Sequence, residues 1–284
     1  MKVDDPLGEE LIRLASELEQ HQIPLIVGGG YGLFLKTKLL LESNEPTRID
    51  PFPSARSTED LDFFLQAEIV SSDAKFRKIR EVLDRDYEPI KGAEYYQFKK
   101  KATTAGLPRP IKVDFLASPP ESEDLRRLVD VDLRRTAPKG KNRVLHAHTT
   151  EEAFLVESTA LRLWLEKGSK NAEISIPHPF AYLFLKLNAV SDRVEDSIKG
   201  PYHAFDVYRI IAMMTEDEWN ESISLGERNA NHRQFEKATS IVANLFANDE
   251  SKGVILVKRF AAQSGDRPET DKLVEDLSAL FQLR

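Results

Sequence analysis

The chain of 284 residues carries 40 basic and 47 acidic side chains, a formal net charge of −7, and no cysteine. This composition excludes disulfides, thiolate metal sites and cysteine nucleophiles, and it argues against an extended nonspecific nucleic-acid-binding surface. Its 41% hydrophobic content is typical of a globular protein, and no apolar run approaches the roughly 20 residues that span a bilayer. The first residues have neither the basic start nor the apolar stretch of a secretory signal, so we expect none. We therefore expect a cytoplasmic protein of two modest domains, with no membrane partner.

The amino-terminal part of the chain favours a helix, a strand, a glycine turn, a second helix and a loop. Apolar residues at helical spacing, a short apolar run and a proline-rich stretch are the patterns that predict these elements. Their bounds are a helix over 6–20, a strand over 23–27, a helix over 31–41 and a loop over 43–57.

Strands and helices alternate further along, and only helices are predicted towards the carboxyl end. The first group has a strand over 60–65, a helix over 73–86 and strands over 95–98, 111–116, 144–148, 160–165 and 173–176, of which 160–165 also fits a helix. The second has helices over 180–194, 203–214, 215–225, 231–246 and 270–283. The predicted fold class is α+β: a mixed sheet flanked by helices in a domain over residues 1–176, followed by an all-helical domain over residues 177–284.

Two carboxylates mark the strand predicted over residues 60–65. Side chains two apart in a strand point to the same side, about 6.6 Å apart, so Asp60 and Asp62 share one face while Leu61 and Phe63 enter the core. Like charges this close repel each other unless a cation or water separates them, and magnesium is a cation that prefers such oxygen ligands. Taken alone, the pair favours two surface acids on an exposed edge strand.

A third carboxylate, Asp114, lies between apolar neighbours in the strand predicted over residues 111–116. Three carboxylates can clamp two metal ions roughly 3.5 to 4 Å apart, which activate an attacking oxygen and stabilise a leaving pyrophosphate. By itself, Asp114 fits an exposed polar residue on a half-buried strand. Together with Asp60 and Asp62, it predicts a site for two magnesium ions.

Gly28, Gly29 and Gly30 join the predicted strand over 23–27 to the helix that follows. Such a turn brings backbone N–H groups and a helix N-terminus close to phosphate oxygens. The contiguous glycines match neither GxGxxG nor GxxxxGK[ST], which argues against a Rossmann dehydrogenase and a Walker-type ATPase. A tight turn that binds no ligand is the alternative.

The order of these motifs resembles the AbiEii-type nucleotidyltransferase toxins of the polymerase-β-like superfamily. The glycine run followed by residues 56–63 (RSTEDLDF) is similar to that family's glycine pair and Arg…Asp-Leu-Asp-Phe signature. Residues 186–193 (KLNAVSDR) are similar to its K-x-x-A-x-x-x-R helix, and residues 199–206 (KGPYHAFD) resemble its following K…D segment. Gly200 departs from the commoner Lys-Asp beginning of that segment. The resemblance covers about residues 23–210 and implies a polymerase-β-like sheet with a helical domain that completes the active site.

The resemblance also implies a role for each matching residue. Asp60 and Asp62 would bind metal. The residues that would contact the nucleotide are Gly28, Gly29, Gly30, Arg56, Ser57 and Thr58. Lys186 and Arg193 would hold the triphosphate, and Asp206 would be a further active-site acid. The spacing of Lys186 and Arg193 places both on one helix face, a suitable pair for phosphate. The alternatives are the solvated side of a core helix for these two, and for Asp206 an ion pair with Arg193 or Arg209. We expect His203 to be structural.

The implied activity is magnesium-dependent transfer of a nucleoside monophosphate from a nucleoside triphosphate (NTP) to an acceptor hydroxyl, with release of pyrophosphate. In such toxins the acceptor would be an RNA end, transfer RNA above all, and a cognate antitoxin would be a partner. The basic cluster between Arg134 and Arg143 is the feature that favours RNA. A small hydroxylated molecule or a protein as acceptor, a non-catalytic nucleotide-binding module, and a plain scaffold domain are the alternatives.

Overall fold

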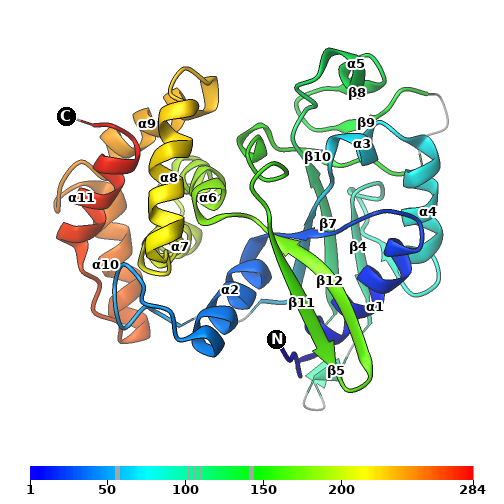
Figure 1. The fold of residues 1–284 in the computed structure, drawn as a ribbon, viewed down its shortest axis with the longest axis horizontal. Helices are drawn as coiled ribbons and strands as arrows, with labels where there is room; N and C mark the ends of the chain where they lie inside the picture. Colours follow the sequence, from blue (N-terminus) through cyan, green and yellow to red (C-terminus); the bar gives the residue numbers. More distant parts are fainter. Residues whose placement is uncertain (55–57, 102, 105–106, 109, 141–143, 284) are drawn as a thin grey trace. The chain divides into compact units, whose positions relative to one another are not determined.

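A computed structural model of the chain describes residues 1–54, 58–101, 103–104, 107–108, 110–140 and 144–283 (Figure 1). The chain forms two compact units. The first, which we call the sheet unit, comprises Met1–Glu42 and Ala55–Pro177. The second, the helical unit, comprises Ser43–Ser54 and His178–Arg284.

An eight-stranded mixed sheet, in the order β11-β12-β1-β2-β7-β4-β3 with β10 beside β7, is the centre of the sheet unit. Its strands are β1 (Ile26–Val27), β2 (Asp60–Phe64), β3 (Glu88–Pro89), β4 (Gln97–Lys100), β7 (Ile111–Ala117), β10 (His148–Thr149), β11 (Leu161–Lys167) and β12 (Lys170–Ile176). β1 runs parallel to β12, and both β2 and β10 run parallel to β7. The central strands β2 and β7 therefore lie side by side and point the same way.

Helices and two small ladders complete the sheet unit. They are α1 (Pro6–Glu19), α2 (Gly29–Ser43), α3 (Ala67–Val70), α4 (Asp73–Leu83), α5 (Glu123–Arg126), the 3-10 turn η1 (Glu151–Ala153) and the paired strands β5 (Thr103–Thr104) with β6 (Leu107–Pro108) and β8 (Val129–Val131) with β9 (Thr136–Pro138). Leu11 of α1 and Phe76 of α4 belong to the same buried cluster as Leu61, Val113 and Phe115 of the sheet. One face of β2 and β7 thus packs into the core.

The helical unit contains α6 (Pro179–Arg193), α7 (Lys199–Ala212), α8 (Glu216–Arg228), α9 (Arg233–Leu245), α10 (Lys252–Ser264) and α11 (Thr270–Leu280) (Figure 1). Its core includes an aromatic group in which the rings of Phe180, Phe184, Phe235 and Phe281 lie 5.1 to 6.3 Å apart. Such offset and edge-on contacts add to the stabilisation from burial.

The segment Ser43–Ser54 packs within the helical unit, although the sequence assigns it to the first domain. The backbone N–H of Arg48 donates to the carbonyl of Met214 at 2.9 Å, and that of Ile49 donates to Ala212 at 3.3 Å. Ile49 is buried, and Arg48 pairs with Asp276 at 2.5 Å. Because the predicted loop contributes a buried side chain and backbone hydrogen bonds, it is a structural part of the second unit.

The predicted α+β class, a mixed sheet with helices followed by a helical region, is confirmed. The helix predicted over 6–20 and the strand predicted over 111–116 are α1 and β7 with small shifts at their ends. The ambiguous segment 160–165 is a strand, because β11 pairs with β12 along seven residue pairs from Leu161↔Ile176 to Lys167↔Lys170.

Two predictions of individual elements differ from the structure, and one helix was missed. The helix expected to begin at residue 203 begins at Lys199, because the side chain of Asp196 accepts hydrogen bonds from the N–H groups of Ile198 and Lys199 at 2.9 and 2.8 Å. The strand expected over 144–148 is reduced to β10. Helix α10 was not predicted, although its buried residues Val254, Val257 and Ala261 have helical spacing.

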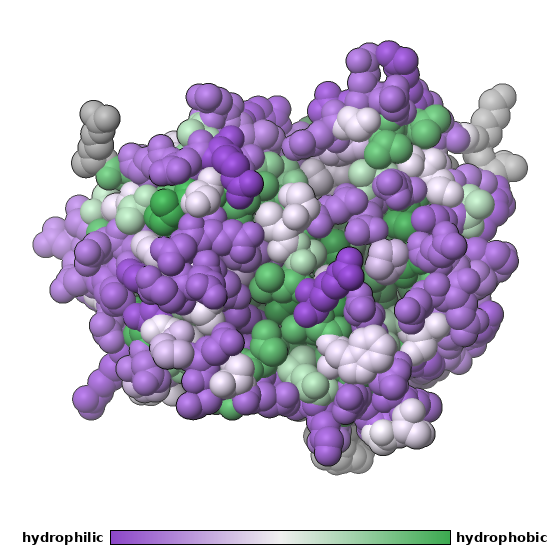
Figure 2. Space-filling view, viewed as in Figure 1, coloured by the Kyte–Doolittle hydropathy of each residue, from purple (hydrophilic) through white to green (hydrophobic). Residues whose placement is uncertain are grey.

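Polar and charged residues cover most of the visible surface of the molecule (Figure 2), as a chain with 31% charged residues requires. Within the part of the chain that the structure describes, no helix is both long and apolar enough to cross a bilayer.

Candidate active site

The two central strands bring Asp62 and Asp114 together. In the parallel ladder between β2 and β7, Asp62 lies opposite Asp114 and Asp60 opposite Lys112. Burial alternates along both strands, so that Leu61, Val113 and Phe115 are buried while Asp60, Asp62 and Asp114 are partly exposed on the other face. Two carboxylates on paired residues of neighbouring strands repel each other. The face turned away from the core is therefore negatively charged along these strands.

The pKa of Asp114 is raised well above its ordinary value. Burial raises its pKa to about 7; the charge of Asp62 raises the pKa as well, and a hydrogen bond from Gln97 lowers it. That bond runs from Gln97 Nε2 to Asp114 Oδ2 at 2.9 Å, because Gln97 of β4 lies opposite Asp114 on the other side of β7. A carboxyl group with this pKa exchanges a proton readily near neutral pH.

Asp60 is farther into solvent, with a side chain that is 45% exposed. Its Oδ1 lies 3.3 Å from Lys112 Nζ, and the two form an ion pair across β2 and β7. The backbone N–H of Asp60 donates to Thr58 Oγ1 at 3.3 Å. The predicted nucleotide contact Thr58 thus lies at the start of β2, with its hydroxyl engaged by the strand backbone.

The glycine turn lies directly against Asp62. The N–H of Gly28 donates to the carbonyl of Asp62 at 2.8 Å, which fixes the end of β1 beside β2. Gly29 opens α2 with a φ of +57°, and a Cβ at this position would lie 1.6 Å from Asp62 Oδ2. Gly30, the next residue of α2, is buried. The carboxylate of Asp62 is therefore seated against the N-terminus of α2, which only glycine permits at position 29.

Magnesium suits the chemistry of these oxygen donors, but the residues do not form a complete cage. Among the described residues, no group of three or more histidine, aspartate or glutamate side chains is arranged to hold a metal ion. Asp62 and Asp114 remain a pair of neighbouring carboxylates, and burial, with the charge of Asp62 as a second cause, raises the pKa of Asp114. A magnesium ion commonly takes one or two carboxylates and completes its shell with water and substrate phosphate. The pair fits that pattern.

In the helical unit, Lys186 and Asp206 are neighbours. Lys186 Nζ of α6 lies 2.8 Å from Asp206 Oδ2 of α7, and Asp206 also pairs with Arg209 of the same helix. All three side chains are at most 8% exposed, and Arg209 Nε donates to the carbonyl of Ser54 at 3.0 Å. The ion pair that was the alternative for Asp206 is present with Arg209. Arg193 is at the last residue of α6, seven residues beyond Lys186.

Several predicted residues fall outside the described part of the chain. Arg56 and Ser57, expected to contact the nucleotide, are among them, as are Lys141 and Arg143 of the basic cluster. Of the remaining cluster, Arg134 is exposed at the turn between β8 and β9, and Arg135 is paired with Asp132 at 2.8 Å.

Two contacts of the acids on the sheet were not predicted: the ion pair of Asp60 with Lys112, and the hydrogen bond that Asp114 accepts from Gln97. Lys112 is two residues before Asp114 in a strand, so the alternation of side chains was a signal that it shares the face of the acids. Gln97 carries no such signal, because its contact with Asp114 depends on the pairing register of β4 and β7. Arg209 was anticipated as one of two partners for Asp206.

Among solved structures, the chain is similar to an antigenic nucleotidyltransferase-like protein from Paracoccidioides brasiliensis, with 16% identity and a TM-score of 0.45 over 98% of each chain. No protein-family model and no curated protein matches the chain.

Proposed function

We propose that the chain is a magnesium-dependent nucleotidyltransferase of the polymerase-β-like type, which moves a nucleoside monophosphate from an NTP to an acceptor hydroxyl. The observation that carries this proposal is the placement of Asp62, opposite Asp114 in the ladder and against Gly29 at the N-terminus of α2. A carboxylate pair binds a divalent ion, and a helix N-terminus favours phosphate. Both features are needed by an enzyme that acts on a triphosphate.

The proposed transfer forms one bond and breaks one. The acceptor oxygen bonds to the α-phosphorus, the bond from that phosphorus to the bridging oxygen breaks, and pyrophosphate leaves with the electron pair while water takes the hydroxyl proton. Bound magnesium would neutralise charge on the phosphates. Asp62 and Asp114 would hold it, and Asp60 would add negative charge at the solvent side. Gly28, Gly29 and Gly30 would let backbone N–H groups approach the phosphates.

The roles that the resemblance implies for residues of the helical unit belong to the same proposal. Lys186, Asp206 and Arg209 form a buried group with two positive charges and one negative charge. The ammonium group of Lys186 supports a role for this residue near an anion, and Arg193 would add a guanidinium. The same contacts also stabilise the packing of α6 on α7, so a loss of activity at Lys186 must be separated from a loss of folding.

An RNA end is the first candidate for the acceptor, as the resemblance implies, and the chain would then act as a toxin or phage-defence component with an antitoxin as partner. The exposed Arg134 at the β8–β9 turn supports contact with phosphate. A small hydroxylated molecule is the second candidate, favoured by a cavity on the same sheet face as the acids.

Label transfer tests the proposal. The purified full chain is incubated with magnesium, each α-labelled NTP and either total RNA or a small-molecule extract, beside the variant Asp60→Ala/Asp62→Ala. We expect label in an acceptor with the native chain and none with the variant. Transfer by both proteins would contradict the assignment of these acids, and nucleotide binding without any transfer would favour a non-catalytic nucleotide-binding module.

A further inference from the structure

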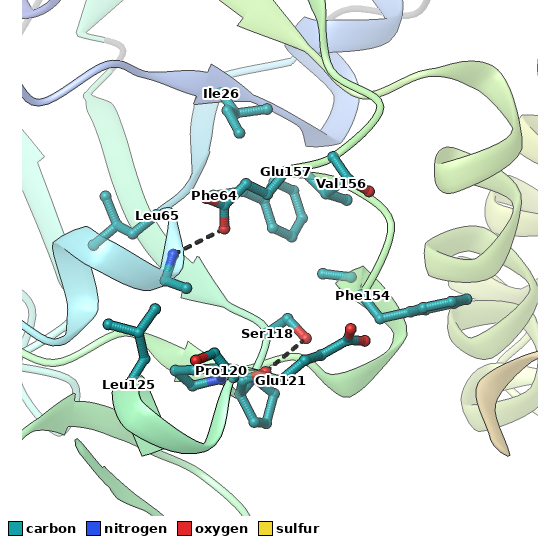
Figure 3. Close-up of a pocket in the computed structure, with 15 residues that line it drawn as sticks. Ile26, Phe64, Leu65, Ser118, Pro120, Glu121, Leu125, Phe154, Val156 and Glu157 are labelled. Atoms are coloured by element: carbon teal, nitrogen blue, oxygen red, sulfur yellow. Dashed lines mark hydrogen bonds between the residues drawn. The ribbon is translucent and has the colours of Figure 1, made fainter. Parts of the chain in front are cut away.

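A cavity of about 390 Å³ opens on the sheet unit beside the carboxylates (Figure 3). Its floor includes Phe64 of β2 and Ile26 of β1, which are paired in the antiparallel ladder of these strands. Phe64 is two residues beyond Asp62 and therefore on the same face, at a separation of about 6.6 Å along the strand. A ligand in the cavity would lie next to the acids that the proposed transfer uses.

The walls of the cavity come from two segments, one after β7 and one after η1. Ser118, Pro119 and Pro120 follow the end of β7, and Phe154 and Val156 follow η1 (Figure 3). These side chains give the cavity an apolar lining with a few polar groups, which is the usual composition of a small-molecule site. Its volume also falls in the range of such sites, roughly 300 to 1,000 Å³.

The charged groups that line the cavity are acidic. Glu121 and Glu157 are both lining residues, whereas no lysine, arginine or histidine is found among the described residues of the lining. The side chain of Arg126 donates to the carbonyl of Pro120 at 2.6 Å but does not line the cavity. A phosphate in this cavity would meet the carboxylate of Glu157, and no cationic side chain among the described lining residues would offset that repulsion, which disfavours an anionic occupant.

Glu157 is an exposed residue whose side chain contacts the backbone of α3. Its Oε2 accepts a hydrogen bond from the backbone N–H of Ala67 at 2.9 Å, at the first residue of α3 (Figure 3). A carboxylate has acceptor capacity beyond one such bond. Glu157 can therefore stay in place and still accept a hydrogen bond from a ligand.

We propose that this cavity binds the acceptor of the nucleotidyl transfer, and that the acceptor is a small molecule with an apolar body, a hydroxyl group and an amine cation. That the ligand is an acceptor rests on the proposed function, whereas the chemical class of the ligand rests on the cavity alone. The hydroxyl would face Asp62 and Asp114, the amine would face Glu157, and the ring would cover Phe64. The cavity thus favours the second of the two acceptor candidates.

A matched series of probes tests the ligand class. Serotonin, N-acetylserotonin and 5-hydroxyindole-3-acetate share one hydroxylated ring and carry a positive charge, no charge and a negative charge. Binding of each to the full chain is measured by calorimetry with magnesium present. We expect serotonin to bind at least about tenfold more tightly than the acetate, with N-acetylserotonin between them.

Variants of lining residues test whether the probes bind in this cavity. Glu157→Gln keeps an acceptor for Ala67 N–H and removes the charge, so serotonin should bind roughly three- to tenfold more weakly while N-acetylserotonin is unchanged. Glu121→Gln should act in the same direction. Glu123→Gln is the control, because Glu123 is exposed, pairs with Arg127 and does not line the cavity. Equal binding of all three probes, or an unchanged serotonin affinity in both cavity variants, would overturn the inference.

Magnesium-dependent binding of a non-hydrolysable ATP analogue, measured on the same samples, separates the two proposals. Analogue binding without binding of any probe would overturn the ligand class and leave the proposed function standing. Probe binding in the expected order without analogue binding would contradict the proposed function alone. Displacement of serotonin by the analogue would show that the cavity holds the nucleobase. If RNA bound more tightly than serotonin and the cavity variants lost that binding, the cavity would be assigned to RNA. Either result would overturn the inference.

Discussion

At the scale of single residues, the site depends on neighbours that sequence spacing predicts only in part. The alternation in DLDF and in IKVDFL places Asp60 and Asp62 on one face, and Lys112 with Asp114 on one face. It cannot place Asp62 beside Asp114, because that contact follows from the register of two strands whose paired residues are 52 positions apart in the sequence. The pKa of Asp114 is likewise a property of the folded chain, since burial and Asp62 raise it.

Replacing Asp114 by asparagine should change how stability depends on pH. The pKa of Asp114 is raised from 3.8 to about 7 in the folded chain, so the folded state binds this proton more tightly than the unfolded state. The free energy of unfolding therefore falls as pH rises between these two values and is level above them. Without magnesium, Asp114→Asn should lack this fall, so the difference in free energy of unfolding between the variant and the native chain should shift by about 2 to 3 kcal/mol in favour of the variant from pH 5 to pH 8.

Urea denaturation of both proteins across that pH range measures the difference. The amide oxygen of asparagine can still accept the hydrogen bond from Gln97, so packing is preserved. Parallel stability curves for the native chain and the variant would contradict the raised pKa.

Replacing Gly29 by alanine should displace Asp62. The added Cβ would lie 1.6 Å from Asp62 Oδ2, and the residue has a φ of +57° that side chains rarely adopt. We expect the affinity for a magnesium–ATP analogue to fall by at least about tenfold. Gly168→Ala is the matched control, because Gly168 has a φ of +60° and open space around the added Cβ. Equal losses in the two variants would mean that backbone strain, and not Asp62, explains the effect.

At the scale of elements, local patterns predict helices well and connections poorly. Helix α1 follows from its apolar spacing and from Asp5, whose side chain accepts a hydrogen bond from Gly8 N–H. The segment Ser43–Ser54 has no periodic pattern, and its place in the helical unit comes from tertiary contacts of Arg48 and Ile49. Proline-rich composition predicts a loop, but it does not predict which unit the loop joins.

Replacing Arg48 by alanine should destabilise the helical unit. Arg48 pairs with Asp276, whose side chain is 3% exposed, and its guanidinium carbon lies 3.9 Å from the centre of the Trp219 ring. Removing the arginine leaves a buried carboxylate without this partner, at a cost of about 2 to 3 kcal/mol. Chemical denaturation followed by tryptophan fluorescence measures it.

The control for Arg48 is Lys252→Ala, because Lys252 pairs with Glu195 in the same unit while both side chains are exposed. Exposed pairs contribute roughly 0 to 1 kcal/mol, so this variant should differ little from the native chain. A similar small loss for Arg48→Ala would show that Ser43–Ser54 does not stabilise the unit.

At the scale of the whole molecule, the change from mixed elements to helices predicts the α+β class, while the order of the strands is beyond any local pattern. β1 is only two residues long, yet it joins β12 and β2 across the centre of the sheet. That arrangement places the glycine turn next to Asp62. The cavity beside Phe64 was not predicted either, because its lining comes from loops after β7 and η1.

The central claim is that Asp62 and Asp114 hold a divalent ion together with a nucleotide. Manganese, a paramagnetic substitute for magnesium, allows a direct measurement by electron paramagnetic resonance on the full chain with a non-hydrolysable ATP analogue. We expect the native chain to bind manganese with the analogue, and Asp62→Asn and Asp114→Asn each to weaken that binding by at least about tenfold. Undiminished manganese binding in both variants would contradict the account.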